Sequence, residues 1–322
     1  MPGMRATAFT DLVGCRVPLQ LAAMPGINTP QLIAAVANAG GLAMIGLPMM
    51  PAPAVAAALE DLSARCDGVL GANFLMPFLD LDALDAAATR ARVIEFFYGE
   101  PDAALVRRAS AGGAVVGWQA GSVAEAEAAV AAGCRYVVAQ GVEAGGHVRG
   151  TMPRSALLAE VTGAVSVPVL AAGGIGNARD VAAALAAGAA GVRVGTRFVA
   201  SEESGAHPQY VEALLHASAE DAVLTGRFSV MWPNAPHRVL QSCIDAAEAH
   251  SDDSVGETEM APGMRMTLPR FSVPAPTRTT TGNIAAMCLY AGRSVGDVTS
   301  VQPAADIIRE LCEGAEHILA EE

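Results

Sequence analysis

A glycine-dense loop with one histidine is the segment of this chain best suited to chemistry. Residues 140–150 read QGVEAGGHVRG. Glycine has no side chain, so such a loop contributes little to a core but lets the backbone approach a ligand closely. A histidine titrates near neutral pH, so His147 is placed to take up or release a proton. The alternative is a surface histidine that only stabilises its own loop.

Two further glycine-rich turns indicate an anion site. Residues 171–176 read AAGGIG and residues 193–198 read RVGTRF. Exposed backbone N–H groups and the positive end of a following helix both attract phosphate. We therefore expect a phosphate group beside these turns, with Asn177 and Asp180 as caps of the next helix. The alternative is that both segments are only tight turns, and the pattern does not name the molecule that carries the phosphate.

Several other kinds of site lack the residues that they need. The chain has no lysine, which excludes a Schiff-base lysine and a P-loop lysine. Its six cysteines are scattered without a C-x-x-C pair, so we expect reduced thiols. The histidines and acidic residues show no ligand spacing, and we expect no metal ion. We also expect no nucleophile elbow of the hydrolase type.

The elements that position these loops follow a repeated order of helix, glycine and apolar run. Alanine-rich stretches favour helices, and a glycine after each one suits the left-handed residue that ends a helix. The apolar runs are continuous, which is typical of parallel strands buried on both faces. The repeats cover residues 33–46, 106–117, 124–141 and 181–195, with the helix-ending glycines expected at Gly40, Gly112, Gly133 and Gly188.

This repeat predicts an α/β protein with a (β/α)8 TIM barrel, and a doubly wound open sheet is the competing fold. Barrel enzymes bind their ligands at the carboxyl ends of the strands, where both the His147 loop and the phosphate turns would lie. The expected strands are Leu19–Met24, Leu42–Leu47, Val69–Phe74, Val93–Phe97, Ala114–Trp118, Tyr136–Gln140, Pro168–Ala172 and Gly191–Val194.

The repeat stops after about residue 217. Residues 219–282 are rich in proline and polar residues, and we expect a smaller irregular or helical insertion that covers the barrel mouth as a lid or substrate segment. Residues 283–322 would return to the barrel as a loop and a final helix from Ala304 to Leu319, where apolar residues have helical spacing. The barrel itself would take residues 1–218.

Charge and hydropathy limit the classes of partner that this protein is expected to bind. The formal net charge of −13 argues against nucleic acid and anionic membranes as partners. Mean hydropathy is high at +0.37, yet prolines and glycines interrupt the uncharged stretch from Val17 to Leu59 too often for a membrane helix. We expect a cytoplasmic protein with a small-molecule substrate, and a homodimer is left open.

Three of these segments together resemble the nitronate monooxygenase family, formerly called 2-nitropropane dioxygenases. The loop QGVEAGGHVRG is followed by AAGGI and VGTRF and preceded by AAMPGINTPQLIAAVANAGGL. The resemblance extends over most of residues 17–204 and weakly over residues 290–296. It implies FMN in the barrel mouth, with His147 on the family's catalytic histidine. The implied cofactor contacts are Ala22, Ala23 and Met24 at the ring, Asn73 and Gln140 as hydrogen-bonding amides, Gly145 and Gly146 beside the cofactor, and Gly173, Gly174, Val194, Gly195 and Thr196 at the phosphate.

The resemblance implies oxidation of alkyl nitronates such as propionate 3-nitronate with O2. His147 would deprotonate the neutral nitroalkane or assist the anion. The sequence departs from the family at Arg193, where glutamine is usual, and it lacks the lysine and many tyrosines that surround the substrate in one bacterial branch. The candidates for the substrate pocket are Tyr98, Trp118, Trp232, His237 and Tyr290, each of which would otherwise be core or lid packing.

Two other functions stay open on the same scaffold. The family is related to flavin enoyl-ACP reductases, which have a similar AGGH loop, and to NAD(P)H:quinone reductases. Such a reductase would use NAD(P)H as a second partner without needing a separate dinucleotide motif. A flavin-binding protein without catalysis is the third reading, and it predicts that His147 can be replaced without loss of function.

Overall fold

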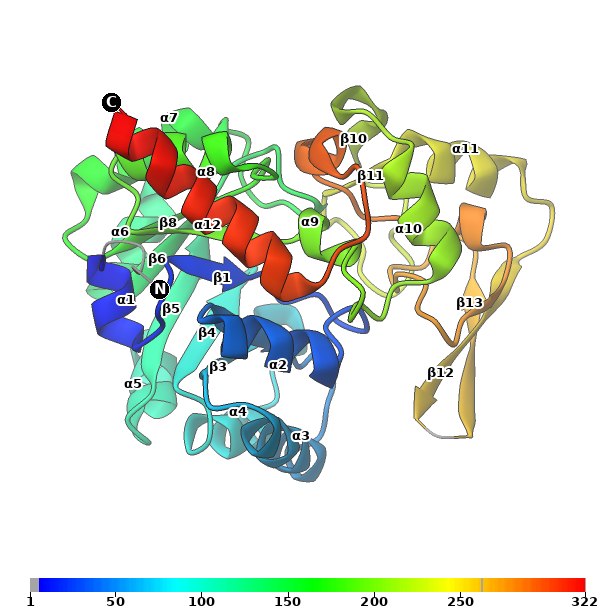
Figure 1. Ribbon diagram of the computed structural model, residues 1–322. Helices are drawn as coiled ribbons and strands as arrows, with labels where there is room; N and C mark the ends of the chain where they lie inside the picture. Colours follow the sequence, from blue (N-terminus) through cyan, green and yellow to red (C-terminus); the bar gives the residue numbers. More distant parts are fainter. Residues whose placement is uncertain (1–5, 262, 322) are drawn as a thin grey trace.

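The computed structural model describes residues 6–261 and 263–321. At its centre, eight parallel strands close into a barrel in the order β1-β2-β3-β4-β5-β6-β8-β9 (Figure 1). The eight predicted strands and the TIM-barrel fold are therefore confirmed. β1 ends three residues earlier than predicted, so Ala22, Ala23 and Met24 follow the strand. The strands are β1 Leu19–Leu21, β2 Leu42–Gly46, β3 Val69–Leu75, β4 Val93–Phe97, β5 Val115–Ala120, β6 Tyr136–Gln140, β8 Val169–Ala172 and β9 Gly191–Val194.

Helices connect these strands and cover the outside of the barrel (Figure 1). Polar side chains begin several of them; Thr29 and Ser122 accept hydrogen bonds from backbone N–H groups in the first turns of α2 and α6. The helices that follow barrel strands are α2 Pro30–Ala39, α3 Ala52–Arg65, α4 Leu81–Ala88, α5 Ala103–Ser110, α6 Val123–Ala131, α7 Arg154–Ala164, α8 Ala178–Ala186 and α9 Thr196–Val199.

Glycines end the repeated helices, with one correction. Gly40, Gly133 and Gly188 have positive φ, as expected for left-handed residues. After α5 the left-handed residue is Gly113, with φ of 90°, and not Gly112. Gly112 serves a different purpose, since a Cβ there would lie 2.3 Å from the carbonyl oxygen of Ala88. It is a site of close approach between two backbones.

Two helices lie outside the barrel, one near each end of the described chain. α1 (Ala8–Val13) precedes β1, and its Phe9 packs edge-on against Tyr136 of β6. α12 (Ala304–Glu321) is the predicted final helix, and it packs along α8 and α2 on the outside of the barrel (Figure 1). Its buried face holds Ile307, Ile308 and Leu311, in agreement with the helical spacing of the sequence.

Residues 219–282 are more regular than the sequence predicted. They contain one longer helix, and their strands belong to two small antiparallel sheets. Strands β12 and β13 make a hairpin that projects from the body in Figure 1. Short strands rich in polar residues carry little periodic signal, which is why the sequence suggested an irregular segment. The elements are η2 Ala219–Asp221, β10 Ala222–Thr225, β11 His237–Leu240, α11 Gln241–Ala249, β12 Ser254–Ala261, β13 Met264–Pro269 and β14 Thr281–Gly282.

A second hydrophobic core lies beneath these elements. It takes residues from both sides of the expected insertion, including Val199, Tyr210, Ile284 and Val295. α10 (Pro208–Leu215) and the short helices η3 (Ile284–Ala286) and η4 (Arg293–Asp297) belong to this part of the chain. Tyr210 donates a hydrogen bond of 2.5 Å to the carbonyl oxygen of Tyr290, which ties the C-terminal tail to this core.

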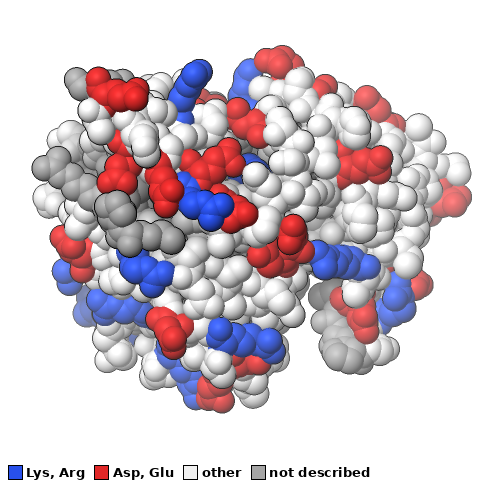
Figure 2. All heavy atoms as spheres, viewed as in Figure 1, with Lys and Arg blue, Asp and Glu red and all other residues white. Residues whose placement is uncertain are grey.

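The surface carries charges of both signs, and the thiols are buried. Acidic and basic side chains are interspersed over the face shown in Figure 2, and no basic patch gathers there. Within residues 6–261 and 263–321, no helix has both the length and the apolarity to cross a bilayer. All six cysteines are buried and outside disulfides. Burial raises the pKa of Cys15 to about 12, so its thiol stays protonated.

Candidate active site

The histidine loop leaves the barrel after β6 and forms a short strand of its own. β7 (Gly146–His147) pairs antiparallel with β11, and His147 lies opposite His237. The N–H of Val148 donates to the carbonyl oxygen of Pro236 at 2.9 Å. From the barrel side, Nε2 of Gln140 donates to the carbonyl oxygen of His147 at 3.0 Å. The backbone of His147 is thus held by a barrel strand and by the inserted segment together.

Aromatic rings surround the His147 imidazole. Trp232 stacks on it, with ring centroids 3.9 Å apart and planes 26° apart. His237, Tyr290 and Tyr98 lie at centroid distances of 5.4, 5.7 and 6.0 Å. Four of the five pocket candidates therefore meet at His147. Trp118 does not, because it lies on the outer layer of β5 against Phe96.

The surroundings keep His147 neutral. Its Nε2 atom is enclosed and has no hydrogen-bond partner among the described residues. Burial first, and then the nearby His237, lower the pKa of His147 to about 3. His237 is fully buried and satisfied by backbone groups, since its Nδ1 donates to Ala235 and its Nε2 accepts from the N–H of Phe228. The free imidazole of the pair is therefore His147, which can accept a proton from a ligand.

The lowered pKa predicts a pH effect on stability. Between pH 6.5 and about 3 the unfolded chain binds a proton at His147 that the folded chain does not, so stability falls as the pH falls. This one group gives a slope of about 1.4 kcal/mol per pH unit. His147→Gln should lose less stability than the parent between pH 7 and pH 4.5, measured from urea midpoints. Equal losses in the two proteins would contradict the buried neutral histidine.

The two glycine-rich turns lie side by side, because β8 and β9 are neighbours in the barrel. Gly173 and Gly174 have positive φ values of 100° and 64°, and Nη1 of Arg154 donates to both of their carbonyl oxygens at 2.9 Å. A Cβ on Gly173 would lie 3.0 Å from the backbone nitrogen of Ala144. Glycine is needed here because the turn packs directly against the His147 loop.

The start of α8 is capped as expected, and one of the two capping side chains is acidic. Asn177 accepts a hydrogen bond from the N–H of Asp180, and the carboxylate of Asp180 accepts from the N–H of Gly176 at 3.1 Å. Nδ2 of Asn177 also donates to Asp297 at 3.0 Å. Two carboxylates, Asp180 and Asp297, thus lie at this helix start and disfavour a further anion there. The turn between β9 and α9 is the better place for a phosphate.

That turn meets the histidine loop and the C-terminal tail. Oγ1 of Thr196 accepts a hydrogen bond of 2.9 Å from the N–H of Gly292. A Cβ on Gly145 would lie 2.4 Å from the nitrogen of Gly292 and 3.1 Å from that Oγ1. A Cβ on Gly195 would lie 3.3 Å from Ala22 and 3.6 Å from the sulfur of Met24. The structure therefore brings Ala22, Met24, Gly145, Gly195 and Thr196 together, with Gly292 added by the tail.

The remaining predicted contacts lie around this group. The carbonyl oxygen of Val194 accepts from the N–H of Ala22 at 2.9 Å, and Ala23 packs against the inner core of the barrel. Gly146 has a φ of 76° and open space where a Cβ would be. Asn73 lies on β3, away from the glycines, and its Nδ2 donates to Glu95 at 2.9 Å.

Buried polar atoms without partners suggest a polar ligand in the barrel mouth. Among the described residues they are Oδ1 of Asn28, Oε1 of Gln140, Nε2 of His147 and Nε1 of Trp118. Three of the four lie on or just after carboxyl ends of barrel strands. An enclosed polar atom without a partner is costly, so such atoms are expected where a ligand completes the hydrogen bonds. The residues present therefore fit a cofactor with donor groups.

Asn28 is a candidate site residue that the sequence reasoning missed. Its Nδ2 donates to the carbonyl oxygens of Ala22 at 2.8 Å and Met44 at 2.9 Å, and so it bridges the ends of β1 and β2. The segment AAMPGINT holds it just after the first strand. A polar amide in an otherwise apolar loop at a strand end was the signal that could have identified it.

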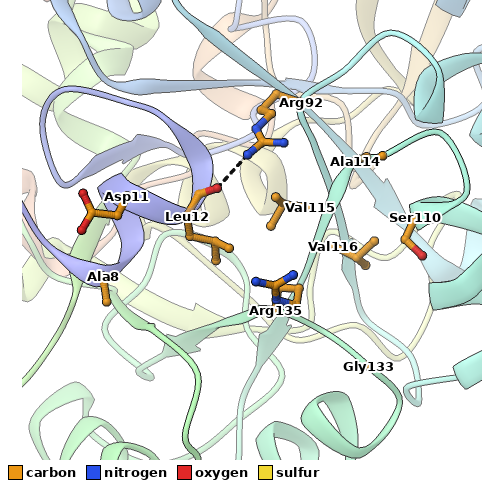
Figure 3. A pocket seen from close by; sticks show the side chains of 11 residues that line it. Ala8, Asp11, Leu12, Arg92, Ser110, Ala114, Val115, Val116, Gly133 and Arg135 are labelled. Atoms are coloured by element: carbon orange, nitrogen blue, oxygen red, sulfur yellow. Dashed lines mark hydrogen bonds between the residues drawn. The ribbon is translucent and has the colours of Figure 1, made fainter.

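A separate cavity lies at the opposite end of the barrel (Figure 3). It has a volume of about 720 Å³, and Arg92 and Arg135 extend toward it from the starts of β4 and β6. Nη2 of Arg92 donates to the carbonyl oxygen of Leu12 at 2.8 Å, so this arginine holds α1 against the barrel. Chemistry in barrel enzymes takes place at the other end. This cavity lies away from every candidate catalytic residue.

Comparison with known proteins adds to this geometry. The family model described as nitronate monooxygenase matches residues 79–314, which include the histidine loop, both glycine-rich turns and the tail. The chain belongs to the nitronate monooxygenase family. The resemblance inferred from the sequence is thereby confirmed, and a member of this family is a flavin-dependent oxidoreductase.

Individual relatives are named for different reactions, and the two solved structures among them share the fold. A (3aS,4S,5R,7aS)-5-hydroxy-7a-methyl-1-oxo-octahydro-1H-indene-4-carboxyl-CoA dehydrogenase of Rhodococcus jostii (strain RHA1) is 33% identical over 254 residues, 78% of this chain and 70% of that protein. FabK from Thermotoga maritima is 28% identical, with a TM-score of 0.80 and 98% of each chain covered. Nitroalkane oxidase from Streptomyces ansochromogenes is 28% identical, with a TM-score of 0.74, and 97% of this chain and 100% of that chain are covered.

Metal ligands do not gather in the part of this family member that the structure describes. Across residues 6–261 and 263–321, no three histidine, cysteine or acidic side chains are close enough together to hold an ion.

Proposed function

We propose that this nitronate monooxygenase family member binds FMN and oxidises alkyl nitronates, such as propionate 3-nitronate, with O2. The observation that carries the proposal is the enclosed, unpartnered Nε2 of His147 at the barrel mouth, beside unpartnered oxygens of Asn28 and Gln140. A flavin held at this site would supply the electron-acceptor chemistry that oxidation of a nitronate with O2 requires. We infer that residues 219–282 act as the lid, because Trp232 and His237 form two walls around His147.

Different residues of this chain would bind different parts of the cofactor. Gly173, Gly174, Val194, Gly195 and Thr196 would hold the phosphate, with the β9–α9 turn as its centre. Ala22, Ala23, Met24, Gly145 and Gly146 would border the flavin, and Asn73 and Gln140 would hydrogen-bond to it. Glycine at position 145 lets Gly292 and Thr196 approach the loop at contact distance. Close packing of this kind excludes water from the reacting atoms.

His147 would act as the proton acceptor. Its imidazole is neutral, so it can take the proton released when a neutral nitroalkane becomes a nitronate. A base works best when its pKa lies near the working pH, and an anion beside the ring raises that pKa. The nitronate is such an anion. The protonated imidazole would then stabilise the nitronate by charge and by a hydrogen bond from Nε2.

An anaerobic stopped-flow experiment tests this function. The FMN-loaded protein is mixed with propionate 3-nitronate in one experiment and with NADH or NADPH in another. We expect loss of the flavin absorbance near its visible maximum with the nitronate alone, and its return when O2 is admitted. Rapid bleaching by a nicotinamide alone, with no response to the nitronate, would contradict nitronate oxidation.

A second function is favoured by the aromatic rings around His147 and by two relatives. The site around His147 is walled by rings, and Val230 and Met231 expose apolar side chains on the same loop as Trp232. An apolar acyl group would fit such a wall. The Rhodococcus relative is named for a carboxyl-CoA compound, and FabK matches almost the whole chain. The alternative is therefore an FMN-dependent NAD(P)H:quinone or enoyl-ACP reductase, which the nicotinamide experiment would reveal.

A further inference from the structure

A buried carboxylate lies inside the barrel below its mouth. Glu95 of β4 has no exposed surface, and its partner is the guanidinium of Arg193 from β9. Oε2 also accepts hydrogen bonds from the Tyr136 hydroxyl at 2.9 Å and from Nε2 of Gln20 at 3.1 Å. The interiors of such barrels are usually filled by branched apolar residues. An ion pair in this place is costly unless every donor and acceptor is matched, as it is here.

The other oxygen of this carboxylate fixes an amide of the site. Oε1 of Glu95 accepts from Nδ2 of Asn73 at 2.9 Å. A carboxylate oxygen only accepts hydrogen bonds here, so the NH2 group of Asn73, and not its oxygen, must face Glu95. The amide oxygen is then turned away from the ion pair, and none of the described residues donates to it. Asn73 can therefore offer its amide oxygen to a ligand as a hydrogen-bond acceptor.

Two other amides at the mouth are oriented in the same sense by different partners. The NH2 group of Asn28 faces two backbone carbonyl oxygens, and that of Gln140 faces the carbonyl oxygen of His147. Both side-chain oxygens are enclosed and unpartnered. Asn28, Asn73 and Gln140 thus each have a side-chain NH2 group bonded to an acceptor of the protein. These bonds fix the direction of the three amide oxygens at the barrel mouth. A matching ligand carries N–H or O–H groups, as do the ring and the ribityl chain of a flavin.

We propose that Glu95 is a positioning residue for the cofactor site, which holds the Asn73 amide with its oxygen toward a donor of the flavin. The proposal rests on the proposed FMN site. Arg193 supports it indirectly, because its guanidinium bonds to Glu95, Gln20 and Gln119 and so holds the carboxylate in place. Glutamine at position 95 could present either an NH2 group or an oxygen to Asn73, so the amide would lose its single orientation.

The test is a double-mutant cycle on the affinity for FMN. FMN is removed from the full-length protein and titrated back, with its fluorescence as the readout, in the parent, Glu95→Gln, Asn73→Ala and the double variant. We expect Glu95→Gln to raise the Kd for FMN by about 3–10-fold, the size of one hydrogen bond. In the Asn73→Ala background the same change should alter the Kd by less than about twofold, since the two residues act as one unit.

Tyr136→Phe is the matched control. It removes a donor to Oε2 of the same buried carboxylate but leaves the bond from Asn73 to Oε1 intact. We expect a lower melting temperature and a Kd for FMN within about twofold of the parent. If Glu95→Gln folds poorly with Arg193 left unpaired, Glu95→Gln/Arg193→Gln removes both charges and takes its place in the cycle.

The outcomes separate this proposal from the cofactor assignment. A Glu95→Gln effect that is equally large without Asn73, or equally large in Tyr136→Phe, would overturn the positioning role and indicate general damage to the barrel. An unchanged Kd in Glu95→Gln would overturn it as well, while FMN binding by the parent would stand. A parent protein that does not bind FMN would refute the cofactor itself, and the positioning role would fall with it.

Discussion

His147→Gln is expected to lower kcat/KM for a neutral nitroalkane such as nitroethane by about 10²–10⁴-fold, the usual contribution of a positioned general base. With preformed ethyl nitronate the loss should stay below about tenfold, because no carbon-bound proton has to be removed. Glutamine keeps the backbone, so the hydrogen bond from Gln140 to the carbonyl oxygen of residue 147 should remain. Initial rates of O2 consumption with both substrates measure the difference.

Two comparisons make this result specific to the imidazole. His216→Gln changes an exposed histidine at the end of α10 and should leave both rates unchanged. The FMN content of the purified His147→Gln protein should equal that of the parent. Equal losses on nitroethane and on its nitronate would remove proton abstraction from the role of His147, and no loss on either would favour a flavin-binding protein without catalysis.

Gly145→Ala is expected to have the second largest effect, and it acts on cofactor retention. The added methyl carbon would lie 2.4 Å from the backbone nitrogen of Gly292 and 2.7 Å from the carbonyl carbon of Ala291, so the loop or the tail must move. Overpacking of this kind costs about 1–3 kcal/mol, or roughly 5–150-fold in affinity if the displaced elements hold FMN. The FMN-to-protein ratio after purification and the Kd for FMN both report it.

Gly163→Ala is the control for this substitution. Gly163 lies in α7, where a Cβ meets nothing within 4 Å, and alanine favours a helix over glycine by about 1 kcal/mol. This variant should keep its FMN and melt no lower than the parent. If Gly145→Ala retained FMN with unchanged affinity, the place where Gly145 packs against Thr196 and Gly292 would not contact the cofactor.

The barrel was predictable because its signal is local and repeated. Several alanine-rich helices, such as the one at residues 181–186, are each followed by a glycine and a short apolar strand. This order identifies one βα unit after another. The same reasoning misplaced one residue, Gly112, since a sequence of two glycines does not show which of them approaches Ala88. It also did not predict the strands within residues 219–282, where strands such as β10 gain their stability from pairing with another strand and not from a pattern of their own.

The candidate site was predictable only where one segment carries it. The glycines of the histidine loop and of the two turns identified these segments as parts of a site, because glycine at such density has few structural uses. The stacking of Trp232 on His147 was not predictable, because it joins residues 85 positions apart through a loop without regular structure. The Glu95–Arg193 pair was missed for a related reason: each residue lies in an apolar strand, and only closure of the barrel brings them together.

The pairing of β7 with β11 has a consequence for how the protein matures during synthesis. The last barrel strand ends at Val194, but the walls of the His147 site come from Trp232, His237 and Tyr290. Contacts between residues so distant in sequence form late in folding. A nascent chain can therefore close its barrel while the histidine loop is still uncovered, and the walls of the site are added only when residues 232–290 have left the ribosome.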